Sequence, residues 1–192
     1  MLTKQGAPNT LATFSFIGAA LGALALTLFA ASSTQASDRL LDLELAFADV
    51  LSELGWHELA AQQYDRLLEG RTLLDRKPAP TTAASIQLKV AELKQRQARE
   101  AVNLSVAGRI AILRQALERY DLALANLQRD DSGKNITEAT LERLTAIRDL
   151  AEQLGKWADE APSPEQRSQR LSEAANTFQM AIDKYAEIST KM

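Results

Sequence analysis

Cysteine is absent from the chain, and histidine occurs once. Without cysteine the protein can form no disulfide, and every metal or redox site built on thiolates is excluded. The single histidine, His57, leaves a two-histidine metal site and a catalytic triad unsupported, so we interpret it as structural or exposed. No glycine-rich phosphate loop or paired-carboxylate motif stands out. We therefore expect no catalytic residue, no cofactor and no metal, and we predict that the protein is not an enzyme.

Glycine and proline are also scarce, with 8 and 5 residues in the whole chain. Long stretches run without a helix breaker, and apolar residues recur in them at steps of three and four. No segment alternates polar and apolar residues with a period of two, so strands are not expected. These patterns predict an all-α protein of about six helices paired as antiparallel hairpins, with a bundle of long helices as the alternative.

The chain also has no excess of positive charge. The chain has 22 basic and 25 acidic residues, for a net charge of −3. A mildly acidic protein has no general attraction for nucleic acid or for an anionic membrane. We therefore expect no nucleic-acid partner.

The N-terminal segment is the one place with a long apolar run. A short head with Lys4 precedes the run over residues 11–31, and a polar stretch of small residues ends at Ala36. This layout predicts a signal peptide over residues 1–36, followed by a domain over residues 37–192. The alternative is an uncleaved membrane anchor over residues 11–31, which is long enough to span a bilayer. In both cases we expect the domain outside the cytoplasm, in a bacterial periplasm or at the cell surface.

The first two predicted helices flank a turn at Gly55. One helix begins near Leu40, the other runs from about His57 to Glu69, and an extended linker follows over residues 70–82. The faces expected to be buried are Leu43, Phe47, Val50 and Leu54 on the first helix, and Ala60, Tyr64, Leu67 and Leu68 on the second.

Residues 82–129 fit either one long helix or two shorter ones. The stripe that begins at Ile86 loses its apolar character if it is continued past Gly108, whereas a new stripe begins at Ile110. We therefore predict a break near Gly108, with a continuous kinked helix as the alternative, because one glycine costs about 1 kcal/mol in a helix. The two stripes are Ile86, Val90, Leu93, Gln97, Ala101 and Leu104, then Ile110, Leu113, Leu117, Tyr120, Leu124 and Leu127.

Two more helices follow, each with a predicted N-cap. Asn135 or Thr137 is expected to cap the fifth helix, and Ser163, followed by Pro164, the sixth. Apolar residues surround much of the last helix, although a terminal helix in a stack needs a polar outer face. We expect that surface to meet a second copy, a partner helix or further sequence. The predicted buried faces are Leu141, Leu144, Ile147, Ala151 and Leu154, then Leu171, Ala175, Phe178, Ile182 and Tyr185.

The spacing of a small residue, an aromatic residue four positions later and an apolar residue three positions after that recurs along the chain. It occurs as Ala60-Tyr64-Leu67, as Ala116-Tyr120-Ala123 and as Ala174-Phe178-Ala181, and it predicts a structural repeat.

With Ala48 and Gly55, the first of these triads falls at the spacings of a tetratricopeptide repeat, and the chain resembles that family over about residues 42–69. The usual tryptophan is Glu44 here, and the later helices are longer than the repeat. The resemblance implies a superhelix of helical hairpins whose concave face binds protein segments. By that resemblance Asp42, Leu45, Asp49 and Ser52 line the groove, and their acids do not fit a clamp for a terminal carboxylate.

Two functions follow from these patterns. We expect a non-enzymatic, extracytoplasmic scaffold or adaptor that binds other proteins, or that self-associates through its last helix. The alternative is a membrane-anchored helical-bundle or coiled-coil subunit of an envelope complex, with the membrane as a partner only if residues 11–31 are retained.

Overall fold

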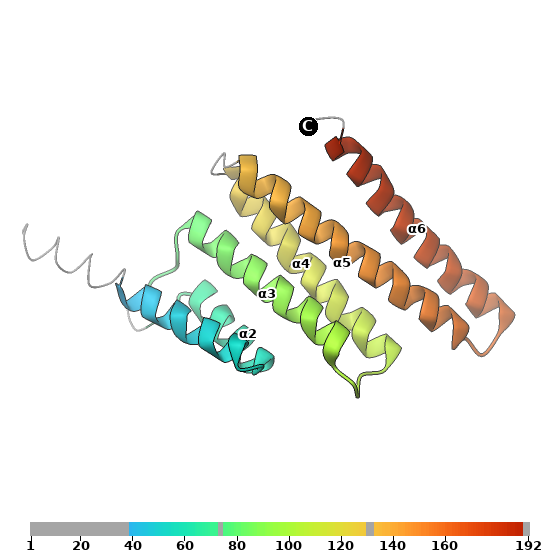
Figure 1. Cartoon of the computed structure of the whole chain (residues 1–192), viewed down its shortest axis with the longest axis horizontal. Coiled ribbons are helices and arrows are strands. Elements are labelled where there is room, and N and C mark those ends of the chain that lie inside the picture. Colours follow the sequence, from blue (N-terminus) through green and yellow to red (C-terminus); the bar gives the residue numbers. More distant parts are fainter. Residues whose placement is uncertain (1–38, 73–74, 130–132, 190–192) are drawn as a thin grey trace, which may run out of the picture. The chain divides into compact units, whose positions relative to one another are not determined.

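A computed structural model describes residues 39–72, 75–129 and 133–189 (Figure 1). These residues are all-α, as predicted, and no strand occurs among them. A first helix is described over residues 39–53. The others are α2 (His57–Leu68), α3 (Pro80–Glu100), α4 (Val106–Arg129), α5 (Gly133–Asp159) and α6 (Pro164–Ser189).

The predicted signal peptide over residues 1–36, and the alternative anchor over residues 11–31, lie outside the described residues. Within the described part of the chain, every helix is too short or too polar to cross a membrane.

The described residues from 44 onward belong to one compact unit, and residues 39–43 belong to another. Within the larger unit, α2 packs on α3, α3 on α4, α4 on α5 and α5 on α6 (Figure 1). From α3 onward short connections make successive helices antiparallel. The turn before α2 uses Gly55, whose φ of +79° is a conformation that glycine adopts without steric cost.

The core lies where α3, α4 and α5 meet. Ala84, Ala91 and Ala98 recur every seven residues on α3 and are all buried. Each belongs to a cluster that also contains residues of α4 and α5. Their small side chains let the helices approach closely, and larger side chains fill the space between them. The larger members are Leu127 beside Ala84, Tyr120 beside Ala91, and Ile110, Leu113, Leu150 and Leu154 beside Ala98.

The first two small-aromatic-apolar triads are buried. Tyr64 and Tyr120 are among the largest fully buried side chains, and the residues four before and three after each of them are buried too. In the third triad Ala174 is buried but Phe178 is exposed. A superhelix of the tetratricopeptide type stays a prediction.

The break between α3 and α4 is confirmed, and the continuous helix is wrong. The break lies earlier than predicted, because Ser105 caps α4. Its Oγ accepts a 3.1 Å hydrogen bond from the N–H of Gly108, which therefore lies in the first turn of α4. Ala101 and Leu104, predicted on the stripe of the preceding helix, lie in the connection.

Two helix starts were predicted too late. Helix α3 begins at Pro80 rather than after Thr82. Proline is favoured at the first helical position, because the N–H that it lacks would have no carbonyl partner within the helix. Helix α5 begins at Gly133, so Asn135 and Thr137 lie inside its first turns instead of capping it. Ile136 packs against a core cluster there, and this packing favours the helical conformation. Ser163 caps α6 as predicted, accepting a 3.2 Å hydrogen bond from the N–H of Gln166.

The buried face predicted for the first helix is wrong. Leu43, Phe47, Val50 and Leu54 are exposed, whereas Ala48 and Leu51 are buried. The first helix therefore packs through the face that carries Ala48 and Leu51, which lies beside its most apolar stripe. Ala48 allows close approach, and Asp49 on that side meets Tyr64 of α2.

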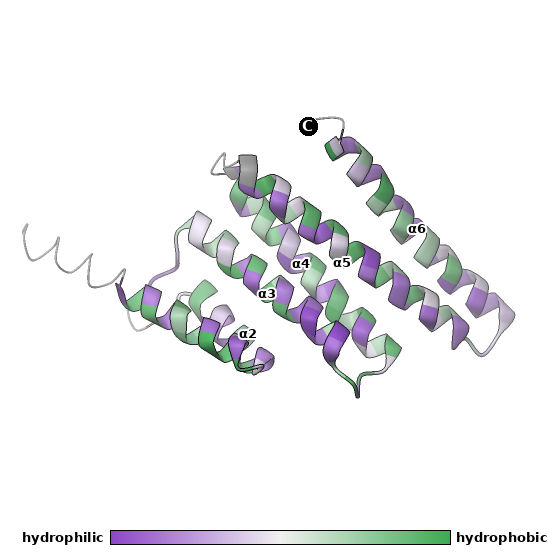
Figure 2. Cartoon of the chain, viewed as in Figure 1, coloured by the Kyte–Doolittle hydropathy of each residue, from purple (hydrophilic) through white to green (hydrophobic). Residues whose placement is uncertain are grey.

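The buried face predicted for α6 is also wrong. Ala174 is the buried residue of this helix. No helix follows α6 in the described chain to cover its outer side. Figure 2 shows that hydrophobic residues recur in α6 among hydrophilic ones. Leu141 of α5, likewise predicted to be buried, is 40% exposed. The predicted core residues of α6 that are exposed are Leu171, Ala175, Phe178, Ile182 and Tyr185.

Candidate functional site

A polar groove lies between the first helix, α2 and α3, with a volume of about 340 Å³. We call it the N-terminal groove. Asp49 and Ser52, two of the four predicted groove residues, line it. Leu45 is half-buried and is not one of its lining residues, and Asp42 belongs to the other unit of the chain. The remaining lining residues are Glu53, Tyr64, Lys89, Glu92, Leu93 and Arg96.

One wall of the N-terminal groove is fixed by three side chains from three helices. The Tyr64 hydroxyl donates a hydrogen bond to the Asp49 carboxylate. Lys89 Nζ lies 2.5 Å from Asp49 Oδ1 and 6.0 Å from the centre of the Tyr64 ring. Asp49 therefore joins the first helix to both α2 and α3.

The ionisation states of this wall follow from its contacts. Partial burial acts to raise the pKa of Asp49, but hydrogen bonds from Lys89 and Tyr64 and the charge of Lys89 outweigh it, so the pKa is lowered. Burial raises the pKa of Tyr64, and the hydrogen bond to Asp49 and the charge of Asp49 raise it further. At neutral pH Asp49 is a carboxylate and Tyr64 a neutral hydroxyl. Such a tyrosine is a poor nucleophile or general base.

The other lining groups are available to a ligand. Glu53, Glu92 and Arg96 are exposed, and Ser52 is half-buried. They present carboxylates, a guanidinium and a hydroxyl beside the fixed wall. The groove therefore offers both donors and acceptors, which suits the backbone and polar side chains of a protein segment.

A group of carboxylates extends from Glu92 in the N-terminal groove to Glu138 and Glu142 on α5. Partial burial raises the pKa of Glu142, and the negative charges of Glu92 and Glu138 raise it further. Glu142 Oε2 is buried without a hydrogen-bond partner. The positive charges of Arg96 and Lys89 offset the repulsion between carboxylates at Glu92. A cation placed beside Glu138 and Glu142 would be stabilised by their negative charges.

A buried polar cluster, which the sequence patterns did not predict, joins α3, α4 and α5. Gln95 accepts a 3.2 Å hydrogen bond from the Tyr120 hydroxyl and donates one of 2.8 Å to Asp149 Oδ2. Arg99 Nη2 lies 2.6 Å from the same oxygen, and Arg148 Nη2 lies 3.0 Å from Asp149 Oδ1. Gln95 lies on the face of α3 that carries Ala91 and Ala98, outside the predicted stripe. Asp149 lies on no apolar stripe of α5, so no sequence pattern indicated its burial.

The electrostatics of Asp149 follow from those partners. Burial acts to raise its pKa, but hydrogen bonds from Gln95, Arg148 and Arg99 and the charge of Arg99 outweigh it, so the pKa lies below its ordinary value. The side chain is only 9% exposed. A carboxylate so enclosed and so fully bonded is a structural anchor.

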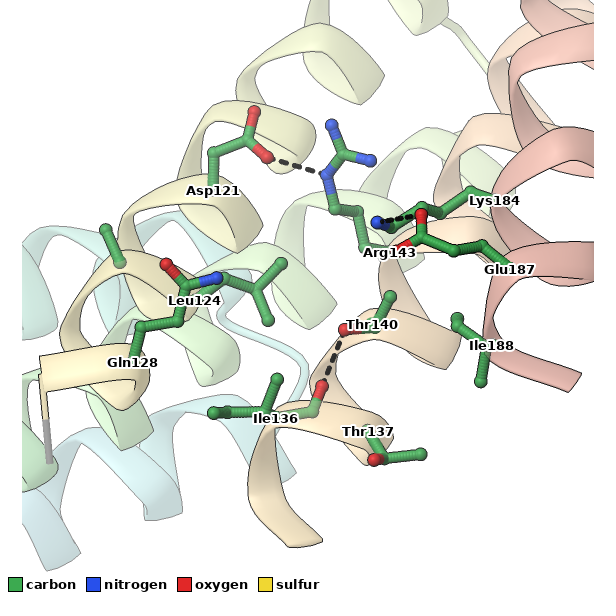
Figure 3. Close-up of a pocket in the computed structure, with 11 residues that line it drawn as sticks. Asp121, Leu124, Gln128, Ile136, Thr137, Thr140, Arg143, Lys184, Glu187 and Ile188 are labelled. Carbon is green, nitrogen blue, oxygen red and sulfur yellow. Dashed lines mark hydrogen bonds and ion pairs between the residues drawn. The ribbon is translucent and has the colours of Figure 1, made fainter. Parts of the chain in front are cut away.

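A second groove, of about 590 Å³, lies between α4, α5 and α6 (Figure 3). Its charged residues pair with each other: Arg143 Nε lies 2.6 Å from Asp121, and Lys184 Nζ lies 2.6 Å from Glu187. The apolar lining residues are Leu124, Ala125, Ile136 and Ile188. With its charges already paired, this groove offers less to a polar ligand than the N-terminal groove does.

His57 lies at the start of α2, with Nε2 3.8 Å from Glu100 Oε2. Among the described residues, no group of three or more histidine, aspartate and glutamate side chains is arranged to hold a metal ion.

Comparison with known proteins adds no relative. The chain matches no family model, no curated protein and no solved structure.

Proposed function

We propose that this protein is a non-enzymatic interaction module that binds a segment of another protein in the N-terminal groove. The observation that carries the proposal is the convergence of three helices on one polar groove, where the Asp49, Tyr64 and Lys89 side chains are already locked together. A preformed wall loses little conformational entropy when a ligand binds, so its contacts translate into affinity.

The exposed charges beside the wall indicate the chemistry of the ligand. Arg96 and Glu53 are placed to pair with opposite charges or with backbone groups. The charge of Glu92 is offset by Arg96 and Lys89, but the negative charges of Glu138 and Glu142 favour a basic side chain at the α5 side. The ligand we propose is therefore a polar protein segment that carries at least one lysine or arginine.

The resemblance to tetratricopeptide repeats supports the same surface. It assigns Asp49 and Ser52 to a groove that binds protein segments, and both residues line the N-terminal groove. The layout of residues 1–36 places this activity outside the cytoplasm in our proposal, as a scaffold or adaptor.

Photo-cross-linking from the groove tests the proposal. A photoreactive residue replaces Ser52 in the full chain, which is irradiated in its native envelope fraction; the same residue at the exposed Gln169 of α6 serves as control. We expect a discrete protein adduct from position 52 that disappears in the Arg96→Glu variant and is absent from position 169. No adduct from position 52, or identical adducts from both positions, contradicts the proposal.

The second candidate is a membrane-anchored structural subunit. The exposed apolar faces of the first helix and α6 favour it, because such faces suit self-association. Intact mass separates the two candidates. A chain that begins at Ser37 supports the free adaptor, and a full-length chain in the membrane that is cross-linked only to itself supports the subunit.

A further inference from the structure

Two apolar faces lie at opposite ends of the helix order. Phe47 on the first helix and Leu54 in the turn directly after it are 54% and 60% exposed, and Val50 lies between them on the same stripe. We call these three residues the N-terminal end face. The C-terminal end face is the α6 stripe Leu171, Ala175, Phe178, Ile182 and Tyr185, whose last two residues are 60% and 61% exposed.

Charge is missing from the middle of both faces. Between residues 171 and 182, the exposed positions of α6 carry only leucine, serine, alanine, asparagine, phenylalanine, glutamine, methionine and isoleucine. Glu173 is half-buried and pairs with Arg114 at 2.6 Å. Between residues 44 and 52 of the first helix, the exposed positions are Ala46, Phe47 and Val50. Aromatic and aliphatic side chains without charge are typical of the core of a protein interface.

The packing inside the unit indicates what covers these faces. Each helix is covered by the next one in chain order, from α2 to α6. The first helix has no described hairpin before it within this unit, and α6 has none after it. A second copy can supply both, because its first hairpin can pack on α6 as a following hairpin would.

The chemistry of the two faces fits this contact. Both stripes step by four and three residues, so both run along one side of a helix and can interdigitate as packed helices do. Neither stripe contains a charged residue, so no charge of one stripe would face the apolar residues of the other. A charged partner surface would instead lose hydration against these faces without gaining an ion pair.

We propose that the protein self-associates head to tail, with the N-terminal end face of one copy on the C-terminal end face of the next. The contact is heterologous, because it joins two different faces. It therefore leaves one free face at each end and allows chains of copies to grow. This inference is independent of ligand binding in the N-terminal groove.

Complementation between two variants tests it. The N-face variant carries Phe47→Glu and Val50→Glu, and the C-face variant carries Phe178→Glu and Ile182→Glu. A matched control carries Leu122→Glu, a change of the same chemistry at a half-exposed residue of α4. The full chains are compared by sedimentation velocity at rising concentration, and circular dichroism verifies that each is helical.

We expect the wild type and the control to form dimers and larger species. Each face variant alone should lose them, and an equimolar mixture of the two should recover dimers but nothing larger, since each copy keeps one intact face. A monomeric wild type, an N-face variant that still dimerises, or a mixture that stays monomeric would each overturn the proposal.

The absence of cysteine allows a second test that leaves the faces apolar. A Val50→Cys chain is mixed with an Ile182→Cys chain and oxidised. The head-to-tail contact predicts that disulfide-linked heterodimers exceed both homodimers. A predominance of Ile182→Cys homodimers, or an equal yield when Leu122→Cys replaces either partner, contradicts it.

Discussion

Asp149 on α5 and Arg99 on α3 form an ion pair with a shortest N–O distance of 2.6 Å, although the two residues are fifty positions apart in the chain. Gln95 donates to the same carboxylate oxygen and accepts from Tyr120, so the pair extends into a cluster that spans three helices. Because Asp149 is almost fully buried, each of its bonds compensates for lost hydration. The cluster fixes the register of α3 against α5.

Replacing Asp149 with alanine should destabilise the fold. The change leaves the buried amide of Gln95 without its acceptor and removes the partner of Arg99, which together should lower the free energy of unfolding by about 1–3 kcal/mol. Urea denaturation at neutral pH measures the loss. Asp159→Ala is the matched control, because Asp159 pairs with Arg167 at 3.2 Å on the surface and should change stability by less than about 1 kcal/mol. Equal effects at the two positions would show that burial of the pair does not matter.

Acid should weaken the fold through Asp49 and Asp149. The folded-state pKa of each lies below the ordinary value of 3.8, so the unfolded chain takes up protons first as the pH falls. Their contribution to stability is present above pH 3.8 and is lost as the pH falls through the folded-state values. Thermal unfolding across this range measures the effect. The Asp149→Asn variant should show a shallower loss than the wild type, and an unchanged slope would contradict the assignment.

Glu142 should change the stability with pH in the opposite direction to Asp49 and Asp149. Its pKa is raised in the folded state, so its contribution to stability is present at low pH and is lost as the pH rises through the folded-state value. Glu142→Gln should therefore raise the Tm slightly at neutral pH and leave it unchanged in acid. The same change at the exposed Glu160 provides the comparison. A Glu142→Gln chain that is less stable at neutral pH would contradict the proposed repulsion.

Substitution of Leu113 tests the core cluster that contains Ala98. It is 1% exposed and lies among Ile110, Leu150 and Leu154. Leu113→Ala should lower the free energy of unfolding by about 2–5 kcal/mol, because it leaves a cavity in a packed interior. Leu122→Ala, at a half-exposed position on the same helix, should change it by about 0.5 kcal/mol or less. Chemical denaturation of both variants gives the comparison, and similar losses would place Leu113 outside the core.

Several elements were predictable because their signals are local. The stripes from Ile86 and from Ile110 differ in phase, and this difference alone predicted two helices where one glycine suggested only a kink. Ser163 before Pro164 predicted the start of α6, and its hydroxyl caps the helix. On α4 four of the six predicted residues are buried, whereas on α3 only Ile86, Val90 and Leu93 are. The second buried face of α3, with Ala84, Ala91 and Ala98, was not predicted, because small residues give little hydrophobic signal.

The N-terminal groove was only partly predictable. Asp49 and Ser52 follow from the resemblance to tetratricopeptide repeats, whereas Lys89, Glu92 and Arg96 resemble the solvated face of any amphipathic helix. Their place in the groove depends on how α3 is rotated against the first helix. No spacing within α3 determines that rotation.

The sequence by itself determined the all-α class, the number of helices and most of their ends, because helix periodicity and capping act over a few neighbouring residues. Tertiary structure alone decided which faces are covered. Phe47 and Ile182 belong to stripes as regular as the one that buries Val90, yet they are exposed because no helix of the described chain packs over them. Tertiary structure also decided that Asp149 pairs with Arg99. Two residues fifty positions apart become partners only when α3 and α5 lie close to each other.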